Sequence, residues 1–159
     1  MAADDTTKVE RVSERELSIT RLFAAPRPLV YRAWSEAALF RRWWVPASVP
    51  GMQLAGCEMD VRTGGQYRLE FAFGDATMAF HGRYLEVVPG ERMVWTNDED
   101  AAGAVTTVTF HDHDGQTLVR VHEQYPTAEA LAEALDGSAA ALPEQLDQLA
   151  AVLAADGQG

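Results

Sequence analysis

Residues 34–45, WSEAALFRRWWV, and residues 60–71, DVRTGGQYRLEF, are the stretches of the chain that decide the fold. The first is a short amphipathic segment that ends in a tryptophan pair. The second contains a Gly-Gly turn, followed by a strand in which large apolar side chains occupy every other position. This pattern predicts bulky aromatic side chains near the mouth of a curved antiparallel sheet, and therefore an apolar pocket.

Further strands extend from this region on both sides. Alternation of apolar and polar residues predicts a first strand at 16–23. We place the later strands at about 52–61, 66–73, 77–88, 91–97, 104–112 and 116–124. Short turns rich in Gly, Pro, Asn and Asp separate them, which predicts an antiparallel meander.

The inward face of residues 77–88 has two interpretations. Two sets of residues compete for it: one set is Phe80 and Tyr84, and the other is His81, Leu85 and Val87. A β-bulge near Gly82 would reconcile both sets, because an extra residue in one strand reverses the alternation beyond it.

Two short helices are predicted after the first strand. Helical spacing of apolar residues begins in 29–34, just after two prolines of the kind that a helix start tolerates. Ser35 can cap a second short helix at 36–43, because its hydroxyl can accept a hydrogen bond from a free backbone N–H.

The C-terminal region is predicted to be helical. A first segment at 128–136 starts from a Thr127 cap and ends at Gly137, and the last helix restarts near Pro143. The last helix carries an apolar stripe of Leu142, Leu146, Leu149 and Leu153, with Glu144, Gln145, Asp147 and Gln148 facing outward. A curved sheet must cover its apolar face. The predicted fold class is therefore α+β, with a curved antiparallel sheet of about seven strands wrapped on a long C-terminal helix.

Length, charge and cysteine content limit the function classes. The 159 residues suit one domain, which we expect at 15–156 after a disordered tail at 1–14. The net charge of −11 argues against nucleic acid as a partner, because phosphate binding depends on Lys and Arg. No apolar run of about 18–20 residues is present, so no membrane span is predicted. Cys57 stands alone, which suits an inert buried thiol in a reducing, cytoplasmic compartment.

Histidines are the main candidates for chemistry. In a strand, His111 and His113 would share a face and could bind one metal ion, but the following Asp114 and Gly115 favour a solvated hairpin tip. We therefore predict no metal and no cofactor. His122 is the best single candidate for a catalytic proton-transfer group, and the alternative is a hydrogen-bonded wall residue without chemistry. Nucleophile elbows, phosphate-binding loops and zinc protease motifs are absent.

The predicted ligand-binding residues are mostly large apolar side chains on the strands. One of Trp43 and Trp44 should contact a ligand while the other packs, because adjacent helical residues point about 100° apart. The predicted ligand-binding set is Trp44, Met59, Tyr67, Leu69, Phe71, Phe80, Trp95, His122 and Tyr125.

Several blocks of sequence carry a resemblance to a known family. They are FAAPRPLVYRAW at 23–34, RRWWVP at 41–46, DVRTGGQYR at 60–68, HGRYLEVVPGERMVWT at 81–96 and LPEQLDQLAAVL at 142–153. Through them the chain resembles the START-like, or SRPBCC, superfamily with its helix-grip fold over 16–154. It is most similar to the bacterial branch related to the activator of the heat-shock chaperone ATPase. The resemblance implies a cavity between the sheet and the C-terminal helix that accepts apolar or aromatic small molecules.

One stretch departs from the pattern that this resemblance implies. Members of the superfamily often carry a Gly-Trp pair at the entry to the last helix, where this chain has GSAAAL at 137–142. We expect these small residues to widen or reshape the mouth of the pocket.

The sequence favours a binding protein over an enzyme. The first interpretation is binding of a small apolar or aromatic molecule in the cavity, in a protein for which a homodimer is one option. The alternatives are a cyclase- or dehydratase-like enzyme in the same cavity, as the resemblance allows, and a domain that interacts with a chaperone or a regulator. A polar pair inside the cavity would favour the enzyme, and a wholly apolar cavity would favour the binding protein.

Overall fold

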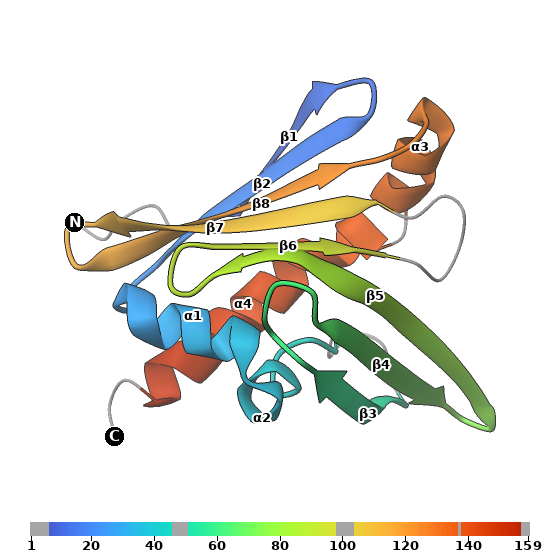
Figure 1. Cartoon of the computed structure of the whole chain (residues 1–159), viewed down its shortest axis with the longest axis horizontal. Helices are drawn as coiled ribbons and strands as arrows, with labels where there is room; N and C mark the ends of the chain where they lie inside the picture. Colours follow the sequence, from blue (N-terminus) through green and yellow to red (C-terminus); the bar gives the residue numbers. More distant parts are fainter. Residues whose placement is uncertain (1–6, 46–50, 98–103, 137, 157–159) are drawn as a thin grey trace.

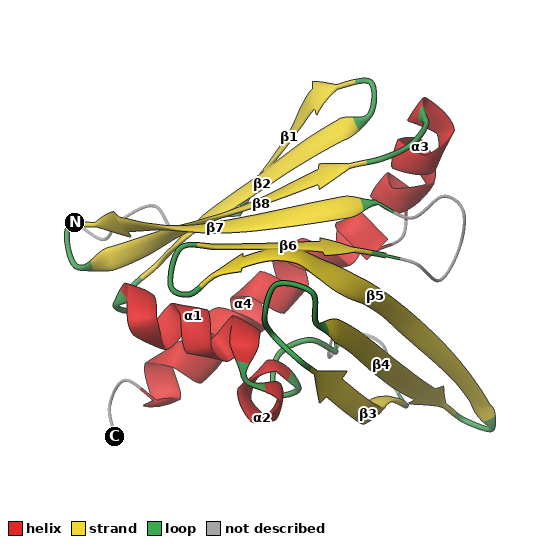
Figure 2. Cartoon of the chain, in the orientation of Figure 1, coloured by secondary structure: helices red, strands yellow, loops and turns green. Residues whose placement is uncertain are grey.

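The computed structural model describes residues 7–45, 51–97, 104–136 and 138–156. Within these residues the chain forms an eight-stranded sheet and four helices (Figure 1, Figure 2). The strands are β1 (Lys8–Ser13), β2 (Glu16–Phe23), β3 (Met52–Met59), β4 (Gln66–Phe73), β5 (Ala76–Val88), β6 (Arg92–Thr96), β7 (Val105–His113) and β8 (Gln116–Gln124). The helices are α1 (Arg27–Ser35), α2 (Ala37–Phe40), α3 (Ala128–Asp136) and α4 (Ser138–Asp156).

All neighbouring strands of the sheet run antiparallel, in the order β1-β2-β8-β7-β6-β5-β4-β3. The strands β3, β4 and the far part of β5 bend away from the others, and α4 runs diagonally across one face of the sheet (Figure 1). The predicted α+β fold, with a curved sheet on a C-terminal helix, is confirmed. The strand count is eight rather than about seven.

The additional strand corrects the prediction of a disordered tail at 1–14. Residues 8–13 form β1, which pairs with β2, and every residue of β1 is exposed. Backbone pairing with the edge of an existing sheet therefore orders this strand, and burial does not. Because β1 has no apolar face, an analysis based on alternation misses it. The remainder of the predicted tail, residues 1–6, lies outside the described residues.

The alternation of β5 reverses within the strand. Phe80 and Tyr84 pack on the core side, and Val87 packs against the same core although its position has the opposite parity. The register of β5 against β6 shifts between Tyr84 and Glu86, and this irregularity reverses the alternation. We predicted a bulge near Gly82, and the bulge lies a few residues further along the strand, between Tyr84 and Glu86.

Gly82 allows two strands and a ring to come close together. A Cβ atom at this position would collide with the carbonyl oxygen of Thr96 and would lie 2.8 Å from the ring of Tyr67. Only a residue without a side chain fits here. The close approach lets Tyr67 lie against β5 and reach the end of β6.

The two short helices after β2 meet at Glu36. Helix α1 continues through Ser35, and Glu36 has an extended backbone without a side-chain cap. The predicted Ser35 cap is therefore wrong, because this residue belongs to the helix before the break. Arg32 forms an ion pair with Glu36 at 2.8 Å, which occupies the carboxylate at the junction.

The C-terminal helices start as follows. The hydroxyl of Thr127 accepts a hydrogen bond of 3.0 Å from the backbone N–H of Ala130, which confirms the predicted cap of α3. Helix α4 begins at Ser138, earlier than the predicted restart near Pro143, which lies inside the helix. Pro143 has no backbone N–H, so it cannot donate the hydrogen bond that the preceding turn of the helix would accept. Gly137, the predicted break, lies outside the described residues.

The apolar stripe of α4 is buried as predicted. Its members are exposed by 5% at most: Leu142, Leu146, Leu149 and Leu153. They belong to the same core cluster as residues of β2, β7 and β8, such as Ile19, Val108 and Val121. Among the described residues, no helix is both long and apolar enough to cross a membrane.

Candidate functional site

A cavity of about 520 Å³ lies between the sheet and the helices, with walls from β3 to β8 and from all four helices. Its volume lies within the range of small-molecule sites, roughly 300–1,000 Å³. Most of the predicted ligand-binding residues line it, namely Trp44, Met59, Tyr67, Leu69, Phe71, Phe80, Trp95 and Tyr125. The alternation of the strands therefore brings eight of the nine predicted residues to one space.

His122 does not line this cavity. Its neighbours Val121 and Glu123 do, and successive residues of a strand point to opposite faces. His122 Nε2 lies 2.9 Å from Glu16 Oε1 on the other face of the sheet. Hydrogen bonds from Ser13 and from His122 hold the pKa of Glu16 below its usual range. The placement of His122 in the cavity wall is therefore wrong, and the cavity is out of reach of its imidazole.

The tryptophan pair divides between packing and the cavity. Trp43 is fully buried and donates a hydrogen bond of 3.0 Å from Nε1 to the carbonyl oxygen of Ala33. Trp44 lines the cavity and stacks on Phe40, with 4.6 Å between ring centroids and 27° between ring planes. The expected division of the pair is present, and Trp44 is the residue that faces the cavity.

Two glutamines of α4 hold the segment that carries Trp44. Gln145 Nε2 donates to the Trp44 carbonyl oxygen, and Gln148 Nε2 donates to the carbonyl oxygens of Trp43 and Val45 at 2.9 and 2.8 Å. We predicted that both glutamines face outward, but Gln145 is only 6% exposed. The reason is that α4 packs against the segment after α2 as well as against the sheet. This contact fixes the position of Trp44 in the wall.

Methionines contribute a large part of the remaining wall. Of the five methionines in the chain, four line the cavity: Met52, Met59, Met78 and Met93. Methionine has a flexible, polarisable side chain that adapts to irregular apolar shapes. A large part of the wall therefore consists of side chains that can change shape.

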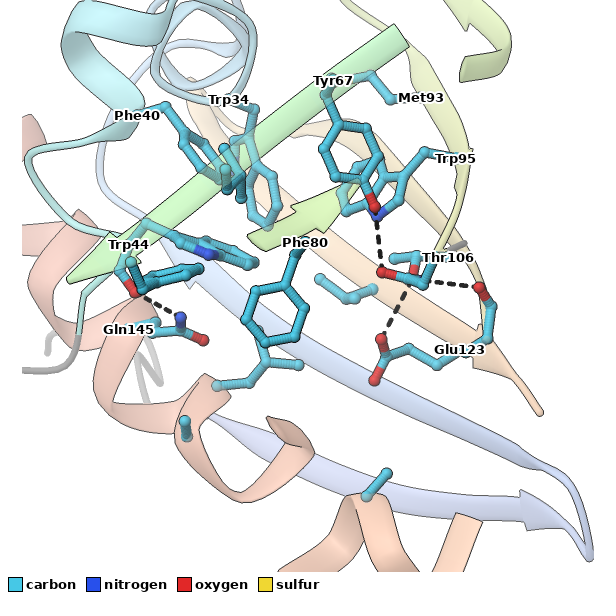
Figure 3. A pocket seen from close by; sticks show the side chains of 18 of the residues that line it. Trp34, Phe40, Trp44, Tyr67, Phe80, Met93, Trp95, Thr106, Glu123 and Gln145 are labelled. Carbon is cyan, nitrogen blue, oxygen red and sulfur yellow. Dashed lines mark hydrogen bonds between the residues drawn. The ribbon is translucent and has the colours of Figure 1, made fainter. Parts of the chain in front are cut away.

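A chain of hydrogen bonds between polar side chains forms one part of the wall (Figure 3). The hydroxyl of Tyr67 lies 3.2 Å from Asn97 Oδ1, and Asn97 Nδ2 donates to Thr106 Oγ1 at 3.3 Å. The Thr106 hydroxyl donates to Glu123 Oε2 at 3.2 Å, and the Tyr125 hydroxyl donates to Glu123 Oε1 at 2.9 Å. We call these five residues the polar chain. Its donors converge on the carboxyl group of Glu123.

Glu123 is the functional candidate that the sequence analysis missed. Burial raises the pKa of Glu123 above its usual range, while hydrogen bonds from Tyr125 and Thr106 act in the opposite direction. Burial, followed by the charge of Glu123, raises the pKa of Tyr125, so its hydroxyl stays protonated and donates at neutral pH. The alternation of β8, anchored on the apolar Val121, was the signal that could have placed Glu123 inward.

The charged groups of the lining are all acidic. The 13 Lys and Arg residues of the chain fall within the described residues, and none of them lines the cavity. Among the described residues, the charged side chains that line it are Glu123 and the exposed Glu133 of α3. An anionic ligand would find no counter-charge in this wall.

The other predicted candidates lie away from the cavity or are inert. His111, Asp112, His113 and Asp114 are all exposed around the turn between β7 and β8. Within the described part of the chain, no group of three or more His, Cys, Asp or Glu residues is placed to hold a metal ion. Burial raises the pKa of the Cys57 thiol, which keeps it protonated at neutral pH.

Comparison with known proteins identifies the family to which the chain belongs. The sequence profile of the family described as activator of Hsp90 ATPase homolog 1-like protein (AHSA1-like) matches residues 24–154. The chain belongs to this family. The expected relationship to the bacterial branch of the START-like superfamily is thereby confirmed.

Solved structures share the fold of this AHSA1-like chain at low sequence identity. A protein from Rhodobacter sphaeroides has a TM-score of 0.84 at 23% identity, covering 94% of this chain and 98% of that chain. A protein from Chromobacterium violaceum has a TM-score of 0.75 at 28% identity, covering 89% and 98%. An AHSA1-like protein from Aeromonas hydrophila has a TM-score of 0.70 at 22% identity, covering 89% and 95%. Among curated proteins, none matches this sequence significantly.

The departure from the superfamily pattern in this AHSA1-like chain lies beside the cavity. Of the stretch at 137–142, Ala141 and Leu142 line the cavity, whereas Gly137 lies outside the described residues. A small residue at 141 occupies little of the space at this part of the wall. The expectation of a wider mouth stays a prediction.

Replacement of Glu123 by glutamine should change how the stability of this AHSA1-like domain depends on pH. The pKa of Glu123 is raised in the folded state, so its contribution to stability is present below the unfolded pKa and is lost as the pH rises through the folded pKa. Glu123→Gln removes that loss. Relative to wild type, the variant should gain stability as the pH rises from about 4.5, the unfolded value. The melting temperatures of both proteins, measured as the pH rises from about 4.5, provide the test. If the two melting temperatures change with pH in parallel, the raised pKa of Glu123 in the folded state is contradicted.

Proposed function

We propose that this protein binds a small, mostly apolar molecule with an aromatic portion in the cavity between the sheet and α4. The observation that carries the proposal is the lining. Aromatic and methionine side chains form most of the wall, and the polar chain contributes a few oriented polar groups. This combination is typical of sites that bind small molecules, in which apolar walls give affinity and a few polar groups fix orientation.

A neutral fluorescent probe should detect this site. We expect N-phenylnaphthylamine to quench tryptophan emission saturably with one site per chain, because Trp34, Trp44 and Trp95 all line the cavity. The probe's own emission should rise over the same concentration range as it leaves water. Linear, non-saturating quenching would contradict binding in a defined cavity.

One observation favours a second candidate function, an enzyme of the cyclase or dehydratase type. The Glu123 carboxyl accepts hydrogen bonds from Thr106 and Tyr125 within the cavity, which is the polar pair that such an enzyme needs. Burial raises the pKa of this carboxyl group above its usual range, which is the direction that prepares a carboxyl group for proton transfer. Turnover of a bound molecule that Glu123→Gln abolishes, while binding persists, would assign the protein to this class.

The remaining expectations stay predictions. A cytoplasmic location is supported by the single cysteine of the chain, Cys57, which suits a reducing compartment. A homodimer stays one option, and an interaction with a chaperone or a regulator rests on the resemblance to the family.

A further inference from the structure

The charged side chains that line the cavity are acidic, and this limits the class of apolar or aromatic ligand that the cavity can bind. We infer that the ligand carries a basic nitrogen, protonated at neutral pH, which pairs with the Glu123 carboxylate while its aromatic portion packs against the apolar wall. This inference rests on the proposed function, since it names the chemistry of the molecule in the same cavity.

Glu123 has acceptor capacity left for a ligand. A carboxylate offers about four lone-pair sites, and the described residues occupy two of them through the hydroxyls of Thr106 and Tyr125. The side chain is half-buried and lines the cavity. A group inside the cavity can therefore reach the carboxylate.

No Lys or Arg side chain among the described residues lines the cavity beside Glu123. The nearby His122 lowers the pKa of Glu123 less than the two hydrogen bonds do, and its imidazole contacts Glu16 on the opposite face of the sheet. A carboxylate in a mostly apolar cavity is unfavourable unless it is paired and hydrogen-bonded. The hydrogen bonds are present, and no positively charged side chain of the described residues shares the cavity with this carboxyl group.

The polar chain is oriented toward a negative charge at Glu123. Asn97 donates to Thr106, which donates to Glu123, and Tyr125 donates from the other side. Hydrogen bonds donated to a carboxylate stabilise its ionised form. The network therefore favours an ionised Glu123 that accepts a hydrogen bond from a ligand N–H. The donors of Asn97, Thr106 and Tyr125 are already used within the protein, so they are not available to a ligand anion.

Aromatic rings surround the space that such a nitrogen would enter. In Figure 3, Tyr67 and Trp95 lie on the same side of the cavity as Thr106 and Glu123, and Phe40 and Trp44 lie across from them. Trp34 lies next to Trp95, with 6.3 Å between the ring centroids. The faces of aromatic rings attract cations. An aromatic amine would thus meet favourable groups at both of its ends, whereas an aromatic acid would place its charge beside Glu123 or against apolar side chains.

Calorimetric titration with three probes of matched shape tests the inference. The probes are naphthylethylamine, naphthylethanol and naphthaleneacetic acid, which share a ring system. At neutral pH the first is a cation, the second is neutral and the third is an anion. We expect the amine to bind at least about ten-fold more tightly than the alcohol, as for one hydrogen bond between charged groups. The acid should bind most weakly. In Glu123→Gln, the affinity for the amine should fall to within about two-fold of that for the alcohol.

Controls separate the role of Glu123 from folding and from net charge. The alcohol should bind Glu123→Gln with an affinity within about two-fold of wild type, which shows an intact cavity. Glu129→Gln removes the same charge from an exposed position of α3 outside the lining, and it should preserve the ten-fold preference for the amine.

Each outcome has a distinct meaning. Equal binding of amine and alcohol by the wild-type protein, or an amine preference that persists in Glu123→Gln, would overturn the inference and leave the proposed function standing. Absence of binding for all three probes, together with a negative result for N-phenylnaphthylamine, would overturn the proposed function and the inference with it.

Discussion

Leu149→Ala is expected to lower the free energy of unfolding by about 2–5 kcal/mol, the range for removing a buried leucine side chain. Leu149 is 0% exposed and lies in the middle of the stripe that α4 presents to the sheet. The cost combines lost burial with the cavity that remains, since neighbouring side chains relax only in part. Equilibrium unfolding in urea or guanidinium chloride provides the measurement.

Leu135→Ala is the matched control for this prediction. Leu135 is a leucine on α3 that is 37% exposed, so the same change should cost far less there than in the core. A loss below about 0.5 kcal/mol for Leu149→Ala, comparable to a surface substitution, would show that α4 is not the cover of the core.

Leu69→Trp should weaken binding of N-phenylnaphthylamine by at least about 100-fold, equivalent to about 2.8 kcal/mol. Leu69 lies in the centre of β4, is 5% exposed and lines the cavity. An indole at this position would extend into the cavity and occupy the volume that the probe needs. Because the space already exists, the larger side chain can be accommodated without disrupting the close-packed part of the core.

Leu85→Trp separates the filling of the cavity from the mere addition of a tryptophan. Leu85 lies on β5, is 48% exposed and does not line the cavity. The probe should bind this variant as it binds the wild-type protein. Unchanged affinity in Leu69→Trp, with a normal unfolding transition, would place the binding site elsewhere.

The boundaries of most strands follow from local pattern. Alternation predicted a strand at 66–73, and β4 spans Gln66–Phe73, because the period of two is a property of the strand itself. The β1 strand was missed because its order comes from pairing with β2. The bulge between Tyr84 and Glu86 was misplaced because it depends on the register with β6, which the residues of β5 alone do not determine.

In the candidate site, too, some features follow from the local sequence pattern and others only from the tertiary structure. The apolar wall could be predicted because residues such as Leu69 and Phe71 alternate within one strand. Glu123 was missed although the buried Val121 two residues earlier gives the parity of β8, because the sequence analysis chose the histidine for the near-neutral pKa of an imidazole and not for the face on which it lies. The bonds from Asn97 through Thr106 to Glu123 connect three separate segments, so they follow only from the tertiary structure.

Nuclear magnetic resonance of methionine methyl groups tests the central claim most directly. Met52 and Met59 line the cavity from the two ends of β3, Met78 lines it from β5, and Met93 lines it from β6. Titration of methyl-labelled protein with N-phenylnaphthylamine should shift all four signals, and the shifts should fit a single dissociation constant. If the probe binds by fluorescence while these four signals stay unchanged, the ligand site lies outside the cavity and the account is contradicted.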